Sequence, residues 1–415
     1  MHVAIAGPIA VADLKSMLGS RIDGLPAGYD GAPFMGSLVQ ELIERGHTVT
    51  GITLDASLPL RTDGVVRYSQ GPLSLSICPC RPRAWMPNGR RPGRIVDFFA
   101  YERRLIEAEL RRVMPDIVHA HWAYEFALAG LAADLPMLVT LHDDPGVVLK
   151  HTRSPYRAFR LLMAHRAMRK ARHITAPSDY LATALGTHCG SPIAIVPNPL
   201  AAYVMDRAKV KPAPQSRRLA MICNGWARLK NPELGIAGFQ RFRATAPEAE
   251  LHLYGHGFGP GGEANQWAQS HGLADGCVFH GPTPHRELMD QLASMDVLLH
   301  PSREESFGVV VAEAMCLGLN VVAGRSSGAV PWVLSCAEEG GSTPGQASSA
   351  GILVDVESSE SIANGIASVF SDGRYAARSK AGMQKALRRF SPKAVADAYQ
   401  VRYESVLRET RGGRR

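Results

Sequence analysis

The stretch that decides the fold runs from Asp296-Val-Leu-Leu-His300 through Pro301-Ser-Arg-Glu-Glu305 to Ser306-Phe-Gly-Val-Val-Val-Ala-Glu313-Ala-Met-Cys-Leu-Gly318. Its first part is a short apolar run that predicts a buried strand, and its second part is a polar loop. From Gly308 the apolar residues follow a helical pattern that stops at Gly318. The stretch therefore predicts a strand, a loop and a helix, with Glu305 just before the helix and Glu313 on its second turn.

Two glutamates placed around a helix start suit one kind of ligand. The free N–H groups and the dipole of a helix N-terminus favour an anion. A carboxylate has two acceptor oxygens, so Glu305 and Glu313 can each bind a vicinal pair of hydroxyls. A phosphate flanked by two diol-binding groups describes a nucleotide-sugar. The spacing alone has an ordinary explanation, because two glutamates eight positions apart on a helix usually form a solvated face.

The residues around the pair are more specific than its spacing. The run Pro301-Ser-Arg-Glu-Glu-Ser-Phe-Gly-Val-Val-Val-Ala-Glu-Ala-Met-Cys-Leu-Gly318 resembles the signature of the family 4 retaining glycosyltransferases. The resemblance implies that Glu305 holds the hydroxyls of the donor sugar and Glu313 the ribose diol. It also implies that the backbone at Phe307, Gly308 and Val309 faces the diphosphate or the sugar. One departure is Trp332, where many relatives carry a glutamate.

Length and composition indicate an ordinary globular protein of two domains. The chain has 415 residues, 46% of them apolar and 20% charged, and that length exceeds what one core usually organises. No apolar run is long enough to span a bilayer, and the N-terminus reads as a core strand, not as a signal peptide. The cysteines are seven and scattered, which favours reduced thiols. We therefore expect a cytoplasmic protein.

The net charge of +8 is concentrated in three basic segments, 81–94, 153–172 and 411–415. The second alternates arginines with apolar residues in a helical pattern, as helices on anionic membrane surfaces do. A solvated helix face and a basic tail explain the same pattern. Peripheral contact with the cytoplasmic face of a membrane is thus one interpretation. Nucleic acid is not an expected partner, since no binding module is recognisable.

Apolar strand runs alternate with amphipathic helices along the whole chain, which predicts parallel α/β sheets. A Pro-rich stretch at 200–217 reads as a linker. We predict an N-terminal Rossmann-like domain at 1–199, a second one that binds the nucleotide-sugar at 218–372, and C-terminal helices with a basic tail at 373–415. Residues 56–94 give no firm prediction. The family resemblance implies the GT-B fold: two doubly wound α/β domains, an interdomain cleft, and a last helix that returns to the first domain.

The N-terminal half carries histidines where predicted strands end. His119 and His121 alternate on one strand, so they share a face, and His142 ends the next strand. Such positions line a ligand crevice. The family resemblance places His121 beside the donor sugar, whereas a buried structural imidazole is the ordinary explanation. A metal hydrolase that uses these histidines and a neighbouring aspartate is a rival hypothesis, but it leaves Glu305 and Glu313 without a role.

The remaining candidate residues lie in glycine-containing loops. A diphosphate leaving group needs cations as its charge develops, and the family supplies an arginine and a lysine after the first strand of the second domain. Here Lys230 fits the lysine one residue early, Trp226 stands at the arginine's usual place, and Arg228 is the candidate replacement. Gly31 lies ahead of a predicted helix, near where the family has a Gly-Gly loop. This chain has Tyr29-Asp30 where that pair would align, flanked by Gly28 and Gly31, and an ordinary turn is the alternative. Phe279 lies in the segment that meets the nucleotide base.

The sequence therefore predicts a retaining, metal-independent hexosyltransferase-type enzyme with no cofactor. A UDP- or GDP-sugar would be the donor, and a glycolipid, polysaccharide or small molecule would supply the acceptor hydroxyl. Two alternatives remain open at this point. One is a nucleotide-sugar-binding protein that has lost turnover, which Trp226 and Trp332 suggest. The other is a nucleotide-sugar epimerase on the same scaffold.

Overall fold

The computed structural model describes residues 1–22, 24–29, 32–61, 63–335 and 350–412. It divides by internal contacts into two α/β units. Unit 1 comprises Met1–Ala201 and Pro392–Arg415, and unit 2 comprises Ala202–Ser391. Gly31, one of the candidate ligand-binding residues, lies outside the described residues.

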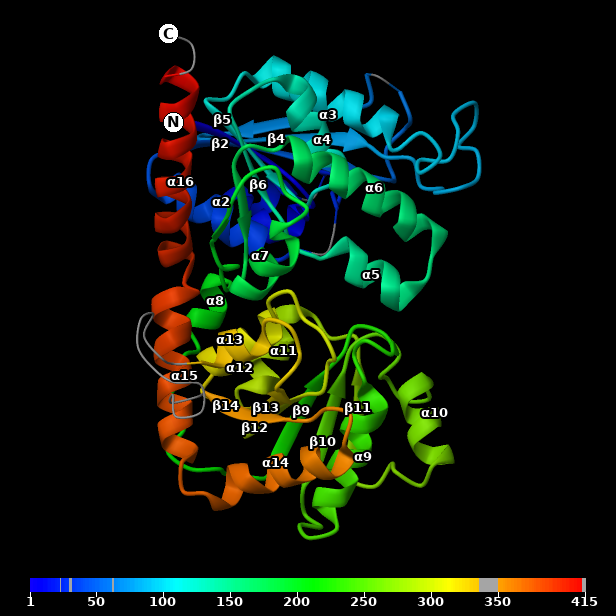
Figure 1. Cartoon of the computed structure of the whole chain (residues 1–415), viewed down its shortest axis with the longest axis vertical. Helices are drawn as coiled ribbons and strands as arrows, with labels where there is room; N and C mark the ends of the chain where they lie inside the picture. The colour runs from blue at the N-terminus through cyan, green and yellow to red at the C-terminus, as the bar shows by residue number, and fades with distance from the viewer. Residues whose placement is uncertain (23, 30–31, 62, 336–349, 413–415) are drawn as a thin grey trace. The chain divides into compact units, whose positions relative to one another are not determined.

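Unit 1 is built on a sheet in the order β3-β4-β2-β1-β5-β6-β7-β8. Figure 1 labels its strands β2, β4, β5 and β6. All neighbours pair in parallel except β3, which runs antiparallel to β4. The strands are β1 (His2–Ala6), β2 (Thr48–Asp55), β3 (Val66–Gln70), β4 (Leu73–Pro79), β5 (Ile117–His121), β6 (Met137–Thr140), β7 (Ile174–Ala176) and β8 (Ile193–Ile195).

Helices cover both faces of the unit 1 sheet, as the continuous apolar strands require. One core lies between the sheet and α2 and α16, with Tyr399 and Tyr403 of α16 fully buried in it. A second core on the opposite face contains α3, α4 and α6. The helices are α1 (Lys15–Leu18), α2 (Phe34–Glu44), α3 (Ala100–Val113), α4 (Glu125–Ala133), α5 (Pro145–Thr152), α6 (Pro155–Lys170), α7 (Asp179–Gly186) and α16 (Pro392–Gly412), with 3-10 turns η1 (Val11–Leu14) and η2 (Gly19–Ile22).

Unit 2 has an all-parallel sheet in the order β11-β10-β9-β12-β13-β14. Its strands are β9 (Arg218–Ile222), β10 (Glu250–Tyr254), β11 (Cys277–Gly281), β12 (Val297–His300), β13 (Asn320–Gly324) and β14 (Gly351–Val354). Its helices are α8 (Ala202–Met205), α9 (Pro232–Arg243), α10 (Glu263–Ser270), α11 (His285–Leu292), α12 (Val309–Cys316), α13 (Val330–Leu334), α14 (Ser359–Ser371) and α15 (Tyr375–Arg389). Residues of α9 and α14 fill the core on one face.

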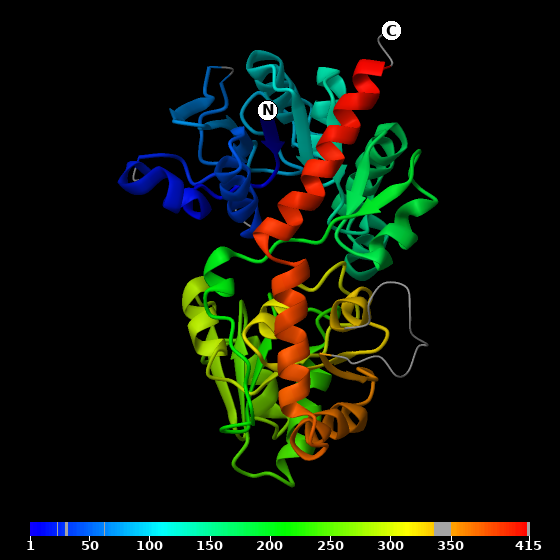
Figure 2. The same cartoon turned by 90° about the vertical axis from the view of Figure 1, so that its left-hand side faces the viewer.

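The last two helices belong to different units. Helix α15 packs with α12 inside unit 2, whereas α16, the red helix of Figure 2, packs on unit 1. The chain therefore returns to its first domain through α16, after the break at Ser391-Pro392. The sequence analysis had grouped α15 with the returning segment, and it placed α8 within a linker.

Two features of unit 1 escaped the sequence analysis. Strands β3 and β4 occupy the region 56–94, where Ser74 and Ser76 interrupt the apolar pattern of β4. Helix α5 begins at Pro145, and the Asp144 carboxylate caps it by accepting the amides of Gly146 at 2.8 Å and Val147 at 3.2 Å. An aspartate followed by proline is a helix-start signal. Asp144 therefore caps a helix.

Candidate functional site

The candidate residues of unit 2 lie where the strand order reverses. Strand β9 is flanked by β10 on one side and β12 on the other, so the loops that follow β9 and β12 diverge at their carboxyl ends. That point is where ligands bind in open α/β sheets. Lys230 belongs to the loop after β9, and Glu305 belongs to the loop after β12.

Lys230 and Glu305 form an ion pair, with Nζ 2.6 Å from Oε1, and Nε2 of His300 lies 3.2 Å from the same oxygen. Burial alone would raise the pKa of Glu305, but the nearby cation and His300 outweigh it and hold that pKa well below its ordinary value. Burial would lower the pKa of Lys230, yet Glu305 outweighs this effect and raises it. Both groups are therefore charged at neutral pH, and each neutralises the other in the ligand-free site.

Asn231 fixes the position of Lys230. Its side chain is fully buried and donates to the carbonyls of Pro301 at 3.2 Å and Val356 at 2.8 Å, so it ties the β9 loop to the β12 loop. Asn231 also has a left-handed backbone (φ 54) at the start of α9, a conformation that asparagine tolerates better than most residues. The pairing of Lys230 with Glu305 thus follows from a buried amide bridge.

Glu313 lies inside α12 and is 2% exposed. Its Oε1 is 2.8 Å from Nε2 of His285, while its Oε2 is buried and has no hydrogen-bond partner among the described residues. A buried acceptor without a partner is costly. This oxygen therefore marks a place where a ligand donor can bind.

The start of α12 is shaped for a close backbone approach. Gly308 precedes the helix with φ +86, a conformation that favours glycine, and Val309 is the first helical residue. The Phe307 side chain is 3% exposed and packs edge-on against Phe390, with ring centroids 5.2 Å apart. Phe307 can therefore face a ligand through its backbone while its ring anchors the loop in the core.

Arg228 and Phe279 have different surroundings. Arg228 is exposed. The hydrogen bond and the charge of Arg303 lower the pKa of Glu357 against the effect of burial, and the charge of Arg228 adds to this lowering. No contact of Arg228 with Glu305 is recorded among the described residues. Phe279 is part of β11, pairs with Leu253, and its partly buried ring packs against the unit 2 core.

The two tryptophans at unexpected positions are packing residues. Trp226 lies against Phe258 and Trp267, with centroid separations of 5.8 and 5.4 Å. Trp332 accepts a hydrogen bond at its carbonyl from Lys385, whose ammonium lies 5.3 Å from the Trp332 ring. Both positions are thus explained by local structure.

In unit 1, His121 ends β5 and lies beside Gly7, which follows β1. A Cβ atom added at Gly7 would lie only 3.1 Å from the Cβ of His121. Nδ1 of His121 is 2.9 Å from Nε2 of His142. Burial, reinforced by the neighbouring histidines, lowers the pKa of His121 well below its ordinary value, and burial lowers that of His142 to about 3. Both rings are therefore neutral, and Nε2 of His121 and Oδ1 of Asn198 are buried without partners among the described residues.

His119 is fully engaged by the protein. Its Nδ1 is 2.7 Å from the Tyr403 hydroxyl and its Nε2 is 2.7 Å from that of Thr140. A metal ligand needs a free ring nitrogen. Within the residues that the structure describes, no group of three or more His, Cys, Asp or Glu side chains could hold a metal ion. His119 is therefore a structural residue that joins α16 to the sheet, and neither of its ring nitrogens is available to a metal.

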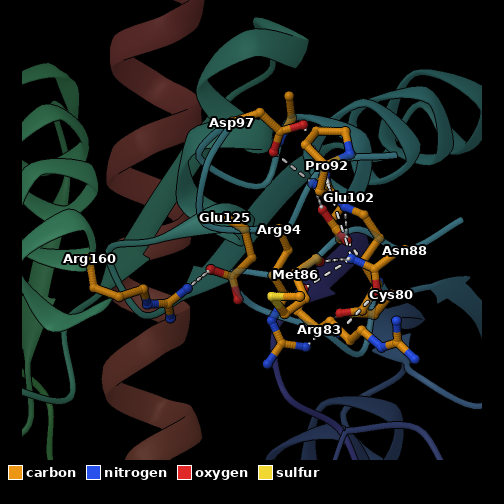
Figure 3. Close-up of polar contacts among 12 residues, drawn as sticks. Cys80, Arg83, Met86, Asn88, Pro92, Arg94, Asp97, Glu102, Glu125 and Arg160 are labelled. Carbon is orange, nitrogen blue, oxygen red and sulfur yellow. Dashed lines mark hydrogen bonds and ion pairs between the residues drawn. The ribbon is translucent and has the colours of Figure 1, made fainter. Parts of the chain in front are cut away.

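Several charges of the basic segments are internal (Figure 3). Arg81 is 0% exposed and binds Glu102 at 2.7 Å and Asp97 at 2.8 Å. Arg160 pairs with Glu125 and lies 3.7 Å from the centre of the Tyr124 ring. Arg81 and Arg160 belong to the basic segments 81–94 and 153–172, and the acidic partners that neutralise them are distant in sequence.

Sequence reasoning missed three residues of the unit 2 site: His285, His300 and Tyr203, whose hydroxyl is 2.6 Å from Nδ1 of His285. His300 ends β12 directly before the Pro301 loop, and a histidine at a strand's carboxyl end was a readable signal. His285 follows Pro284 at a helix start. Tyr203 lay in the predicted linker and gave no signal.

Two family models match the chain. The model of Glycosyltransferase Family 4 matches residues 33–201, and the model of Glycosyl transferases group 1 matches residues 206–386. A D-inositol 3-phosphate glycosyltransferase of Xylanimonas cellulosilytica is 33% identical over 128 residues, which are 31% of this chain and 28% of that protein. The chain's matches span about a quarter to two fifths of the length of such curated relatives.

Solved structures show the same fold over the whole chain. The sucrose-phosphate synthase of Thermosynechococcus elongatus has a TM-score of 0.71 at 17% identity, covering 99% of this chain and 100% of its own. The Anabaena protein HepE, in complex with UDP and glucose, has a TM-score of 0.64 at 17% identity, covering 98% and 100%. These likenesses establish the architecture expected from the sequence. The chain belongs to the family 4 glycosyltransferases (glycosyl transferases group 1) and has the GT-B fold.

Proposed function

We propose that this protein is a retaining glycosyltransferase that moves a sugar from a UDP-sugar to an acceptor hydroxyl. The observation that carries the proposal is the cluster at the start of α12. The Lys230–Glu305 pair precedes the helix, Gly308 opens its N-terminus, and the buried Oε2 of Glu313 lacks a partner among the described residues. The cation and the backbone amides there match a diphosphate, and the two carboxylates match the two diols of the same donor.

In this proposal each group takes one part of the donor. Glu305 binds the sugar hydroxyls and Glu313 the ribose, while the backbone at 307–309 faces the diphosphate. Lys230 would shift from Glu305 toward the diphosphate as its charge develops. Arg228 is a second cation on the same loop, the backbone of Phe279 would meet the base, and Gly31 would take the part of the family's first glycine loop. His121, as a neutral imidazole, would shape the reacting centre.

The stereochemistry and the absence of a metal requirement are part of the proposal. The acceptor oxygen would attack the face that the diphosphate leaves, and the leaving oxygen would help to take its proton, so no separate general base is assigned. Lys230, Arg228 and the α12 dipole would offset the leaving-group charge. The acceptor would be a glycolipid, a polysaccharide or a small molecule, and UDP is favoured over GDP because HepE is solved with UDP and glucose.

The experiment is a thermal-shift screen of UDP- and GDP-sugars followed by assays of donor cleavage and transfer. We expect stabilisation by a UDP-sugar, and loss of turnover by about a hundredfold or more in Glu305→Gln and Lys230→Ala. Glu248→Gln, which removes an exposed carboxylate paired to Arg217 in the same unit, should leave turnover unchanged. Unchanged rates in both site variants would refute the site. Binding without turnover would favour a binding protein, and an isomerised donor without acceptor would favour an epimerase.

We also propose a cytoplasmic protein whose unit 1 touches an anionic membrane surface. Among the described residues, no helix combines the length and apolarity that crossing a bilayer requires. Trp85, Met86 and Leu162 are 45%, 65% and 58% exposed, and Trp85 contacts Phe159 of α6, the helix that carries the exposed Arg166 and Arg169. Apolar side chains beside cations suit such a surface.

Vesicle sedimentation tests this contact. The protein should bind vesicles that contain phosphatidylglycerol, in a salt-sensitive way, and bind phosphatidylcholine vesicles weakly. Leu162→Glu should weaken binding, whereas Met114→Ser, at a position 67% exposed elsewhere on unit 1, should not. Equal binding to both vesicle types would contradict the proposal.

A further inference from the structure

Glu313 is the end of a chain of three side chains from three separate segments. Tyr203 of α8 has its hydroxyl 2.6 Å from Nδ1 of His285, the first residue of α11. Nε2 of His285 is 2.8 Å from Oε1 of Glu313 in α12. All three belong to unit 2, so the arrangement depends on the packing of that unit alone.

The direction of the hydrogen bonds follows from the chemistry of the groups. A carboxylate only accepts, so Nε2 of His285 must donate to Glu313. In a neutral imidazole the other ring nitrogen is then an acceptor, and it accepts a hydrogen bond from the Tyr203 hydroxyl. The histidine tautomer is thereby fixed, and every donor in the chain points toward the carboxylate.

The outer end of the chain is itself held in place. The Arg286 guanidinium lies 3.9 Å from the centre of the Tyr203 ring, and Arg207 donates to the Tyr203 carbonyl. The rings of Tyr203 and His285 meet edge-on, with centroids 5.7 Å apart. Tyr203 therefore cannot turn away without breaking a stacking contact, and this keeps the His285 ring oriented.

The consequence appears at the other carboxylate oxygen. With Oε1 bound by His285, the Glu313 side chain, which is 2% exposed, cannot rotate freely, and Oε2 stays buried without a partner among the described residues. An acceptor held in this way is pre-organised for a donor hydroxyl, and pre-organisation raises affinity because less freedom is lost on binding. We infer that Tyr203 and His285 are positioning residues that aim Glu313 at the ribose hydroxyls of the donor; this rests on the proposed function.

The experiment compares UDP with 2′,3′-dideoxy-UDP, which lacks the hydroxyls that Glu313 would bind. Calorimetry on the full chain gives the ratio of the two dissociation constants for the wild type and each variant. We expect His285→Leu to weaken UDP binding by about tenfold and Tyr203→Phe by a few-fold, as for lost hydrogen bonds to a charged group. Neither should change dideoxy-UDP binding beyond about twofold. His285→Gln, which keeps a donor, should restore part of the preference for UDP.

The control is Tyr375→Phe, which also removes a buried hydroxyl from unit 2, one that donates to the Asp296 carbonyl at 3.1 Å. It should lower the melting temperature and leave the UDP preference intact. If the wild type prefers UDP and the His285 and Tyr203 variants keep that preference, the inference is wrong and the proposed function stands. If the wild type binds UDP and dideoxy-UDP equally, the inference also falls. If the wild type binds none of UDP, dideoxy-UDP and GDP, both the inference and the proposed function are wrong.

Discussion

Removing Lys230 gives the most direct test of how the unit 2 site is balanced. In Lys230→Met the Glu305 side chain, 15% exposed, would lose the ammonium now 2.6 Å from its Oε1. Breaking a buried ion pair from one side typically costs about 3 to 5 kcal/mol, because it leaves an uncompensated charge. Since the Lys230 side chain is itself 27% exposed, we expect a loss near the lower limit, about 3 kcal/mol.

In Lys230→Met, the contribution of Glu305 to the pH dependence of the unfolding free energy should have the opposite sign to that in the wild type. In the intact protein the folded-state pKa of Glu305 is lowered, so its stabilising contribution is present above the unfolded pKa and is lost as the pH falls through the folded pKa. Without the cation, burial raises that pKa and His300 and Cys223 remain as neighbours. Glu305 in the folded variant then takes up its proton at a higher pH than it does in the unfolded chain. The variant therefore becomes relatively more stable as the pH falls from about 7 to about 5.

The assay is urea unfolding of the wild type, Lys230→Met, Glu305→Gln and the double variant at both pH values. The double variant should lose much less than the sum of the single losses, because removing both charges leaves none buried. Additive losses, or a pH slope in Lys230→Met equal to that of the wild type, would refute the reasoning.

Three further predictions concern other sites. Burial lowers the pKa of His119 to about 3, so at pH 5 this histidine binds a proton in the unfolded protein but not in the folded one. The free energy of unfolding should therefore fall by about 2 kcal/mol from pH 7 to pH 5. Urea unfolding of His119→Gln should not show this loss. A pH dependence of its unfolding free energy equal to that of the wild type would contradict the prediction. Gly308→Ala should weaken UDP binding in calorimetry, because φ +86 costs a side chain about 1 to 2 kcal/mol; unchanged affinity would contradict it. Arg81→Met leaves Glu102 buried without a cation, and among the described residues only the backbone amide of residue 81 still donates to it, at 2.9 Å. The variant should lower the urea-unfolding free energy by about 3 to 5 kcal/mol, whereas a loss below about 1 kcal/mol would show that Glu102 is solvated.

The elements around the site could be predicted from short patterns. The apolar run before Pro301 and the helical spacing after Gly308 predicted β12 and α12, and the structure confirms both. Their positions place Glu305 ahead of the helix and Glu313 within it. Such patterns succeed because strand and helix periodicity are local properties of the sequence.

The composition of the basic segments was a poorer guide. Arg81 and Arg160 lie in the basic segments, and each has a carboxylate partner on another element, Glu102 and Glu125. Asp144, which follows the predicted strand end at His142, caps α5. In each case the side chain's role depends on a neighbour that a count of charges does not include.

The sequence by itself determined the alternation of strands and helices, the family signature from Pro301 to Gly318, and therefore the family and its GT-B fold. Only the tertiary structure decided that Lys230 neutralises Glu305 across 75 positions and that His285 orients Glu313 across 28. The physical reason is that backbone propensity and periodicity act between close neighbours in the chain, whereas an ion pair or a hydrogen bond depends on distances that exist only once the sheets have assembled.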